Sequence, residues 1–265
     1  MKAKNGRLLL EGGHMDYVRF GSGPRALLLL PGLGDGLRTV KGTALPMAWM
    51  YRAFAKEFTV WMPSRREPLS EGTTIRDMAR DLCDAMDAWG IDRADVVGVS
   101  MGGMIAQELA IGWPDRVGRL VLAVTAPGSN PILEESIGEW LDQARRGDHS
   151  ALMESNLRRL YSTDYYRKNR WMVPALGILT KPKSYDRFLV QAGACLSHDT
   201  RDRLREIKAP TLVIGGEQDL ALGPDASREL AAAIPGAALK MYPQWGHSLY
   251  EEAPDFNETV LEFLK

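Results

Sequence analysis

A serine flanked by glycines follows a short apolar run in the segment VVGVSMGG, residues 96–103. Ser100 lies two residues from Gly98 and two from Gly102, which gives the pattern G-x-S-x-G. A serine in a sharp strand-to-helix turn needs neighbours without side chains, because the backbone passes close to itself there. Such a turn exposes the hydroxyl, and the helix that follows offers free N–H groups to an anion. We therefore expect Ser100 to be a nucleophile; the alternative is a glycine-rich turn whose serine caps the helix.

A serine hydroxyl attacks a carbonyl efficiently only when a base takes its proton. The chain has four histidines, and His247 lies in a loop just after the last predicted strand. His14 opens an early strand, and His149 and His198 fall in a charged helical region, so we expect these three to be exposed or structural. His247 is therefore the predicted base; the alternative is a loop histidine without a partner.

The imidazole of such a base needs a carboxylate that fixes its tautomer and stabilises the imidazolium. Asp219, in the segment VIGGEQDLALGPD, follows an apolar strand and two glycines and precedes His247 in the chain. Glu217 and Asp225 are rivals, although Asp225 suits the first turn of the next helix, where a negative charge interacts favourably with the helix dipole. We predict that Asp219 is the partner of His247.

Backbone N–H groups must stabilise the negative charge that develops on the carbonyl oxygen. The residue after the nucleophile, Met101, supplies one such N–H group. The second donor is expected in the loop LPGLGDG, residues 30–36, where Leu33 is the first choice and Gly34 the second. The alternative for this loop is a flexible glycine-rich connection.

The elements that must position these residues alternate between strands and helices. Two short strands are expected at 8–11 and 14–20, and continuous apolar runs predict buried strands at 26–30, 58–62, 95–99, 117–124, 211–214 and 239–242. Helices are expected around 49–56 and at 74–89, 101–111, 224–234 and 254–264. This alternation predicts an α/β fold with right-handed βαβ units and a parallel sheet covered by helices on both faces.

The alternation stops between residues 128 and 207. This stretch has charged, helix-favouring segments at 131–146, 150–160, 164–179, 184–195 and 199–207, and no convincing buried strand. We therefore predict a core formed by residues 1–127 and 208–265, interrupted by a helical insertion at 128–207.

Composition limits the possible partners and compartments. With 265 residues, 45% apolar and 25% charged, the chain is typical of a soluble globular protein with a sizeable core. A net charge of −1 argues against a nucleic-acid binder or a polybasic membrane protein. Cys83 and Cys195 are far apart and read as free thiols in a reducing compartment. The N-terminal segment lacks the apolar stretch of a signal peptide, and no apolar run is long enough to span a membrane, so we expect a cytoplasmic protein.

These motifs together resemble the α/β-hydrolase family over nearly the whole chain. The resemblance rests on Pro31-Gly32-Leu33-Gly34, the serine turn at 98–103, Gly216-Glu217-Gln218-Asp219 and Gly246-His247. It implies a mostly parallel eight-stranded sheet, a helical cap over the site, and neither a cofactor nor a metal. Within the family the sequence looks most like capped carboxylesterases, enol-lactonases and carbon–carbon bond hydrolases. The serine nucleophile disfavours the haloalkane dehalogenase and epoxide hydrolase branches, which use aspartate.

Two segments depart from the family pattern. Many members have His-Gly where this chain has Pro31-Gly32, and many have Asp-x-Arg-Gly-x-Gly where this chain has PSRREP at 63–68. Both departures leave the predicted catalytic residues intact and bear on substrate specificity. Arg65 and Arg66 in the second segment are expected either to bind a substrate carboxylate or to form a solvated surface pair.

We expect the enzyme to hydrolyse an ester of a small or medium apolar acyl group through an acyl-enzyme on Ser100. The expected substrate-binding residues are Gly34, Trp49, Trp140, Met153 and Trp171, and methionines favour tolerance of varied apolar groups. A lactonase or a hydrolase of carbon–carbon bonds in diketones would use the same three catalytic residues and is the alternative. A non-catalytic small-molecule receptor on the same fold is a further alternative, which would not need all three residues.

Overall fold

The computed structural model describes residues 2–265, in which eight strands form one sheet in the order β1-β2-β4-β3-β5-β6-β7-β8. β2 pairs antiparallel with β1 and with β4, and all the other neighbouring strands pair parallel. The sheet is therefore mostly parallel and eight-stranded, as expected. The strands are β1 Ala3–Leu10, β2 Gly13–Gly21, β3 Arg25–Leu30, β4 Phe58–Pro63, β5 Ala94–Val99, β6 Val117–Ala123, β7 Thr211–Gly216 and β8 Ala238–Tyr242.

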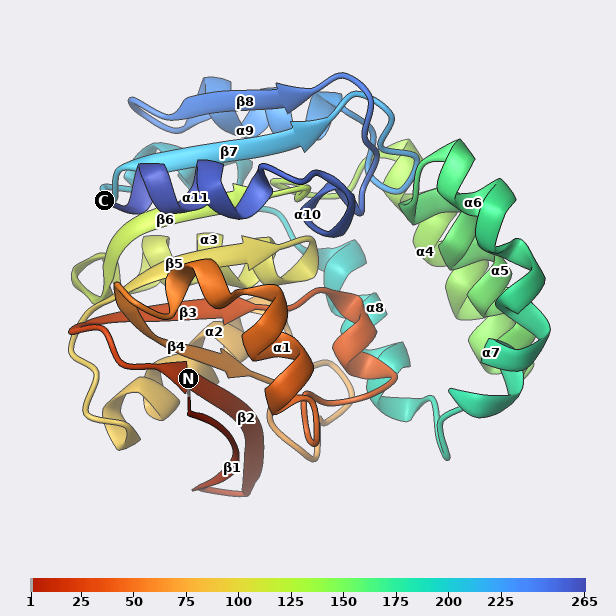
Figure 1. Cartoon of the computed structure of the whole chain (residues 1–265), viewed down its shortest axis with the longest axis horizontal. Coiled ribbons are helices and arrows are strands. Elements are labelled where there is room, and N and C mark those ends of the chain that lie inside the picture. The colour runs from red at the N-terminus through yellow and green to blue at the C-terminus, as the bar shows by residue number, and fades with distance from the viewer. Residues whose placement is uncertain (1) are drawn as a thin grey trace.

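Helices connect the strands and cover both faces of the sheet (Figure 1). The α-helices are α1 Ala44–Met50, α2 Ile75–Ala88, α3 Met101–Gly112, α4 Pro131–Arg145, α5 His149–Leu160, α6 Thr163–Asn169, α7 Val173–Leu179, α8 Asp186–Ser197, α9 Asp225–Ala233, α10 Leu249–Glu252 and α11 Phe256–Leu264. The 3-10 helices are η1 Leu33–Gly36, η2 Arg52–Phe54, η3 Pro114–Arg116, η4 Arg170–Met172 and η5 Arg201–Glu206.

The central strands are apolar throughout because helices bury both of their faces. In β3, Leu28 and Leu30 pack into one hydrophobic cluster with side chains of α2, α3 and α9. Leu27 and Leu29 point to the other face, into a second cluster with side chains of α1, η2 and α11. Alternate residues of one strand thus belong to different cores, which explains why the sequence shows a continuous apolar run instead of an alternating one.

Two of the helix predictions are wrong in detail. The helix expected around 49–56 begins earlier, because Pro46 is tolerated in the first turn of α1, and it ends at Met50, before the C-cap Tyr51, where ψ is 24°. The single helix expected at 164–179 is divided into α6, η4 and α7. Pro174 lies in the first turn of α7, where its missing N–H group breaks no hydrogen bond, whereas a continuous helix would need that donor.

A run of helices, α4 to α8, occupies the chain between β6 and β7. In Figure 1 these helices lie beyond the carboxyl ends of the parallel strands, and α8 returns towards η1. We call residues 128–207 the insertion; the division of the chain at its two ends stays a prediction. Among the helices of residues 2–265, none is both long enough and apolar enough to cross a lipid bilayer.

Candidate active site

Ser100 connects β5 to α3 in a conformation that residues with a Cβ rarely adopt. Its φ is 54° and its ψ is −124°. The Ser100 N–H group donates to the carbonyl of Ala123 at 2.9 Å, and the Thr125 hydroxyl donates to the Ser100 carbonyl at 2.7 Å. Neighbouring β6 and the segment that follows it therefore hold the strained residue on both of its backbone groups.

The glycines around Ser100 are required by close backbone contacts. A Cβ on Gly98 would lie 2.5 Å from the carbonyl oxygen of Gly102, and a Cβ on Gly102 would lie 2.1 Å from the carbonyl oxygen of Leu30. Real Cβ atoms do not approach backbone oxygens so closely, so neither position accepts a side chain. The turn that presents Ser100 therefore depends on the absence of side chains, as the sequence pattern predicts.

His247 and Asp219 form a buried hydrogen-bonded pair beyond the ends of β7 and β8. The distance from His247 Nδ1 to Asp219 Oδ2 is 2.8 Å, and both side chains are buried. Asp219 Oδ1 accepts two further hydrogen bonds, from the N–H groups of Ala221 at 2.8 Å and Leu222 at 3.0 Å. Because an ionised carboxylate only accepts hydrogen bonds, Nδ1 of His247 carries the proton and Nε2 is left to act as a base.

The rival residues lie elsewhere. Glu217 and Asp225 both form ion pairs with Arg228, at 2.6 and 3.1 Å. His14 lies 3.2 Å from Glu67, and His149 contacts the hydroxyl of Thr180 at 2.9 Å. The remaining histidine, His198, is buried, and burial lowers its pKa to about 4. Of these residues none lines the cavity that holds Ser100, for the part of the chain that the structure describes.

Two backbone segments offer N–H groups near the serine. Met101 is the first residue of α3, and Leu33 is the first residue of η1. Gly32 packs against the nucleophile, since a Cβ on it would lie 3.2 Å from Ser100 Cβ. Within residues 2–265 the N–H groups of Met101, Leu33 and Gly34 donate to no protein acceptor. All three are free to bind an oxyanion, and the assignment of Met101 and Leu33, with Gly34 as the second choice, stays a prediction.

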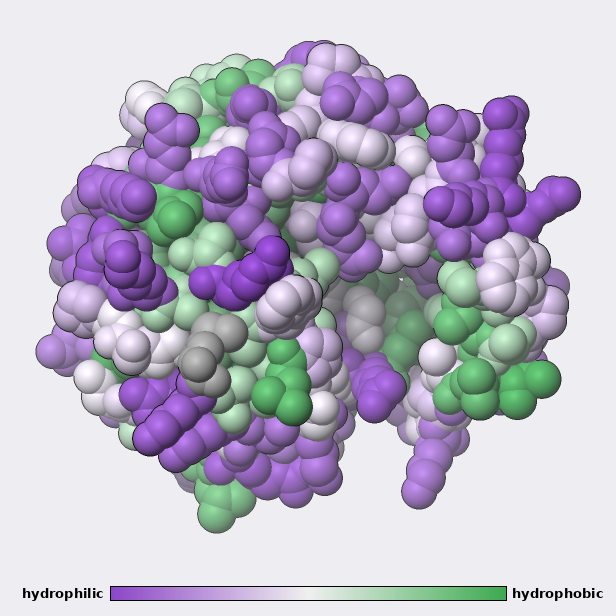
Figure 2. Space-filling model, viewed as in Figure 1, coloured by the Kyte–Doolittle hydropathy of each residue, from purple (hydrophilic) through white to green (hydrophobic). Residues whose placement is uncertain are grey.

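Ser100 and His247 open into one cavity of about 580 Å³ between the core and the insertion. Figure 2 shows the surface hollowed between these two parts, with apolar side chains inside the hollow. Apolar residues from both parts line the cavity, among them Leu33, Met47, Tyr51, Phe54, Trp140, Met153, Leu157, Leu160, Met172, Leu176 and Phe188. The cavity volume falls in the range typical of small-molecule sites.

The expected substrate-binding residues divide into two groups. Gly34, Trp140 and Met153 line the cavity, whereas Trp49 and Trp171 do not. Trp49 is 70% exposed and stacks under the guanidinium of Arg52 at 4.5 Å, and Trp171 is 75% exposed. Both tryptophans lie on the solvent-facing sides of short helices. Residue type alone does not distinguish such a tryptophan from one that lines the cavity.

The sequence analysis does not predict several polar residues of the cavity. Arg38 follows the glycine-rich loop, lines the cavity and forms no ion pair with any residue of the described chain. Tyr250 and Glu251 also line the cavity. The only signal for the last two was their position three and four residues after His247, in the segment HSLYEE.

Arg65 and Arg66 have different roles from either of those expected. Arg65 is buried, and its guanidinium donates to the carbonyl of Pro31, beneath the loop that carries Leu33. Burial lowers the pKa of Arg65. Arg66 lies 3.3 Å from Asp81 and donates to the carbonyl of Glu11. Neither arginine lines the cavity, so neither takes a substrate carboxylate there.

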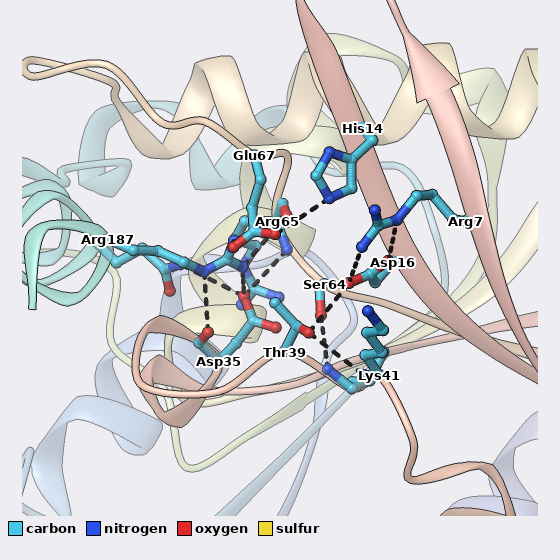
Figure 3. Close-up of polar contacts among 12 residues, drawn as sticks. Arg7, His14, Asp16, Asp35, Thr39, Lys41, Ser64, Arg65, Glu67 and Arg187 are labelled. Atoms are coloured by element: carbon cyan, nitrogen blue, oxygen red, sulfur yellow. Dashed lines mark hydrogen bonds and ion pairs between the residues drawn. The ribbon is translucent and has the colours of Figure 1, made fainter. Parts of the chain in front are cut away.

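Residues 30–36 form the Leu33 loop, and behind it the buried carboxylate of Asp35 links the core to the insertion. Figure 3 shows Arg187, from α8, reaching towards Asp35, Arg65 and Glu67. Arg187 pairs with Asp35 Oδ2 and also donates to the carbonyls of Asp35 and Arg65. The Arg65 N–H group donates to the same Asp35 oxygen at 3.1 Å. The position of the Leu33 loop is therefore coupled to the position of α8.

A group of possible metal ligands lies in the same region. Ligand atoms of His14, Asp16 and Glu67 lie within 4.8 Å of one another. Arg7 and Thr39 already donate to Asp16, and Arg187 lies 3.2 Å from Glu67. Because the arginines neutralise both carboxylates and the group lies outside the lining of the cavity, we assign it no ion.

Replacing Gly102 with alanine should disable the serine turn. The new Cβ would collide with the Leu30 carbonyl and displace Ser100, so we expect labelling of Ser100 by a fluorophosphonate to slow by about 100-fold or more. Gly112→Ala is the matched control, because it lies on the same helix and its Cβ would meet no atom within 4 Å. Equal labelling rates for the two variants would contradict the role of Gly102.

Replacing Arg187 with glutamine should destabilise the fold, because it leaves the Asp35 carboxylate buried without its counter-charge. We expect a loss of about 3–5 kcal/mol in the free energy of unfolding, measured by urea denaturation. Arg146→Gln removes an exposed ion pair with Asp142 and should cost less than about 1 kcal/mol. Similar losses in both variants would show that the Arg187–Asp35 pair contributes no more than a surface pair.

Comparisons with known proteins agree with this geometry. Residues 25–254 match the family model described as the alpha/beta hydrolase fold. The chain is 31% identical to a 2-hydroxy-6-oxononadienedioate/2-hydroxy-6-oxononatrienedioate hydrolase of Burkholderia vietnamiensis, over 94% of this chain and 90% of that one. It is 33% identical to a 2-hydroxy-6-oxo-6-phenylhexa-2,4-dienoate hydrolase of Comamonas testosteroni, over 71% and 68%. The solved enol-lactonase of Burkholderia xenovorans LB400 superposes with a TM-score of 0.82 and 27% identity, over 98% and 99%. The chain belongs to the α/β-hydrolase family.

Proposed function

We propose that this hydrolase cleaves a carbon–carbon bond beside the carbonyl group of a small oxo acid, with Ser100 as nucleophile, His247 as base and Asp219 as its partner. One relative above 30% identity is named as a hydrolase of a 2-hydroxy-6-oxo dienoate, and another as a hydrolase of a 2-hydroxy-6-oxo dienedioate and trienedioate. These names favour this reaction over the ester hydrolysis expected from the sequence. The observation that carries the proposal is the unpaired Arg38, which lines the same cavity as Ser100 and His247.

Arg38 gives the cavity a group that recognises an acid. Besides tyrosines, four residues with acidic or basic side chains line the cavity: Asp35, Arg38, His247 and Glu251. Arg187 already neutralises Asp35, and Asp219 holds His247. Arg38 is therefore the cation available to a substrate carboxylate, which a guanidinium binds through two parallel hydrogen bonds. The apolar lining supplied by Trp140, Met153 and their neighbours suits the rest of the carbon skeleton.

The first half of the reaction forms an acyl-enzyme. His247 Nε2 accepts the proton of the Ser100 hydroxyl as Oγ bonds to the substrate carbonyl carbon. The N–H groups of Met101 and Leu33 stabilise the oxyanion that results. A 2-hydroxy-6-oxo dienoate reacts as its 2-oxo tautomer, in which the proton of the 2-hydroxyl group has moved to carbon 5. The C6 oxyanion then re-forms its carbonyl, the bond between carbons 5 and 6 breaks, and its electron pair passes through the neighbouring double bond into the 2-oxo group. His247 returns its proton to the resulting dienolate, so the fragment leaves as an enol that keeps its carboxylate.

The second half of the reaction releases the acid. His247 takes a proton from water, and the hydroxide attacks the acyl carbon of the acyl-enzyme. The tetrahedral intermediate collapses, the bond from Ser100 Oγ to the acyl carbon breaks, and Oγ recovers its proton from His247. Asp219 remains ionised throughout and stabilises the imidazolium in both halves.

Hydrolysis of an enol lactone is a second candidate. The enol-lactonase of Burkholderia xenovorans LB400 has the same overall fold over nearly the whole of both chains. A lactone needs the same nucleophile, base and oxyanion donors, and its leaving group is an enolate oxygen instead of a carbon. A simple ester is the third substrate class that this arrangement can attack, and a non-catalytic receptor would not need the His247–Asp219 pair.

The test is a substrate panel with wild type and two variants. We expect turnover of a 2-hydroxy-6-oxo dienoate to exceed that of an enol lactone and of p-nitrophenyl butyrate, measured as kcat/KM. Ser100→Ala should lower kcat by at least about 1,000-fold on any of them. Arg38→Gln should raise KM for the dienoate by about tenfold or more, because it removes a charge-assisted hydrogen bond.

The neutral ester is the matched control for Arg38→Gln, since it has no carboxylate to lose. Preferential turnover of the lactone would favour the second candidate, and turnover of the ester alone would restore the original expectation. An equal effect of Arg38→Gln on the dienoate and the ester would refute carboxylate recognition by Arg38. Failure of folded wild type to react with every substrate and with a fluorophosphonate would point to a receptor.

A further inference from the structure

A second polar group lies in the cavity, and the proposed mechanism does not use it. It consists of the carboxylate of Glu251 and the phenol groups of Tyr51, Tyr161 and Tyr250, all of which line the cavity. Tyr51 is the C-cap residue after α1, Tyr161 is the C-cap residue after α5, and Tyr250 and Glu251 lie on α10. Three separate elements thus bring these side chains to the cavity. We call this group the Glu251 subsite.

The carboxylate of Glu251 has no cationic partner. The Tyr161 hydroxyl donates to Glu251 Oε2 at 2.6 Å, and this is the one hydrogen bond that residues 2–265 make to the side chain. No lysine, arginine or histidine of the described chain forms an ion pair with Glu251, although the side chain remains accessible. The neighbouring Glu252 differs, because it accepts two hydrogen bonds from Ser162, at 2.9 and 2.7 Å.

The surroundings of Glu251 favour a positive or hydrogen-bond-donating guest. Burial raises the pKa of Glu251, and the hydrogen bond from Tyr161 only partly opposes this effect. Burial also raises the pKa of Tyr51 and Tyr250, and the charge of Glu251 raises both further, so these phenols stay protonated. Protonated tyrosines offer π faces that attract cations. A guest that donates to Glu251 would therefore add a charge-assisted hydrogen bond to a carboxylate that is accessible from the cavity and has no cationic partner.

We propose that the Glu251 subsite selects substrates that carry a hydrogen-bond donor and rejects a second carboxylate. Among donors it prefers a protonated amine to a hydroxyl group. The inference rests on the proposed function only in taking this cavity as the substrate site. A substrate whose one carboxylate contacts Arg38 can place an amino or hydroxyl group against Glu251. A second carboxylate placed there would meet a like charge at short range without a compensating cation.

Binding of simple six-carbon probes to the double variant Ser100→Ala, Arg38→Gln tests the subsite without requiring turnover and without the carboxylate-binding guanidinium of Arg38. The probes are hexylammonium, hexan-1-ol and hexanoate, which share one chain and differ in the terminal group. Binding is measured by titration calorimetry and by quenching of tryptophan fluorescence, since Trp140 lines the cavity. We expect hexylammonium to bind about tenfold or more tightly than hexanoate, with hexan-1-ol between them. Glu251→Gln in the same background should remove that preference and leave hexan-1-ol within about threefold.

Glu262→Gln is the matched control, because it removes the same charge from an exposed position on α11 and should leave the preference unchanged. Tyr161→Phe removes the hydrogen bond to Glu251 and keeps its charge, so the preference for hexylammonium should persist. Thermal unfolding of each variant establishes that it is folded.

Three results would overturn the Glu251 subsite: tighter or equal binding of hexanoate, an unchanged preference in Glu251→Gln, or no saturable binding of hexylammonium. These binding measurements need no hydrolysis. They can therefore refute the Glu251 subsite while the substrate panel supports the proposed reaction, or support the subsite while the panel refutes the reaction. A preference for hexylammonium in a protein that cleaves none of the panel would keep the subsite and refute the proposed reaction.

Discussion

The backbone of Ser100 is held at positive φ, and that conformation depends on two positions where no Cβ fits. Gly98 faces the Gly102 carbonyl, and Gly102 faces the carbonyl of Leu30 at the end of β3. The close approach brings β3, β5 and the first turn of α3 together at one point. The Leu33 loop leaves β3 at that same point. The glycines permit the close approach of β3 to α3, and this approach brings the loop next to Ser100. A larger residue at either position would separate the nucleophile from the donors that its reaction needs.

The insertion is attached to the core through the same loops that carry the catalytic groups. The Ser248 N–H group, next to His247, donates to the carbonyl of Leu160 at the end of α5, at 2.7 Å. Arg187 of α8 binds Asp35 in the Leu33 loop. The first contact therefore holds the segment of the proposed base, His247, and the second holds the loop that carries Leu33, a proposed oxyanion donor. A displacement of the insertion would therefore alter the cavity wall and the positions of the proposed catalytic groups together.

The sequence predicts those features that local chemistry determines. Buried parallel strands need continuous apolar runs, and a strained serine turn needs glycines, so the sheet and the positions of Ser100, Asp219 and His247 follow from the sequence. The direction of a side chain on a short helix depends on tertiary packing instead. Trp49 and Trp171 face solvent, whereas Trp140 faces the cavity, and the residue type is the same. Arg38 and Glu251 escape detection because their significance lies in the lack of a partner, which only the folded chain reveals.

The distribution of paired and unpaired charges separates structural from ligand-binding roles. Buried carboxylates of the core have arginine partners: Asp16 with Arg7, Asp35 with Arg187, Asp95 with Arg25 and Glu108 with Arg203. A buried charge without a partner lowers stability, so such pairing is what folding alone would select. Arg38 and Glu251 differ, because both are exposed at the cavity and form no ion pair within the described chain, with each other or with any other residue. Their charges add nothing evident to the stability of the fold, and a bound molecule with a carboxylate and a donor group would compensate both. The two unpaired charges of the cavity therefore support the proposed substrate, which has both a carboxylate and a donor group.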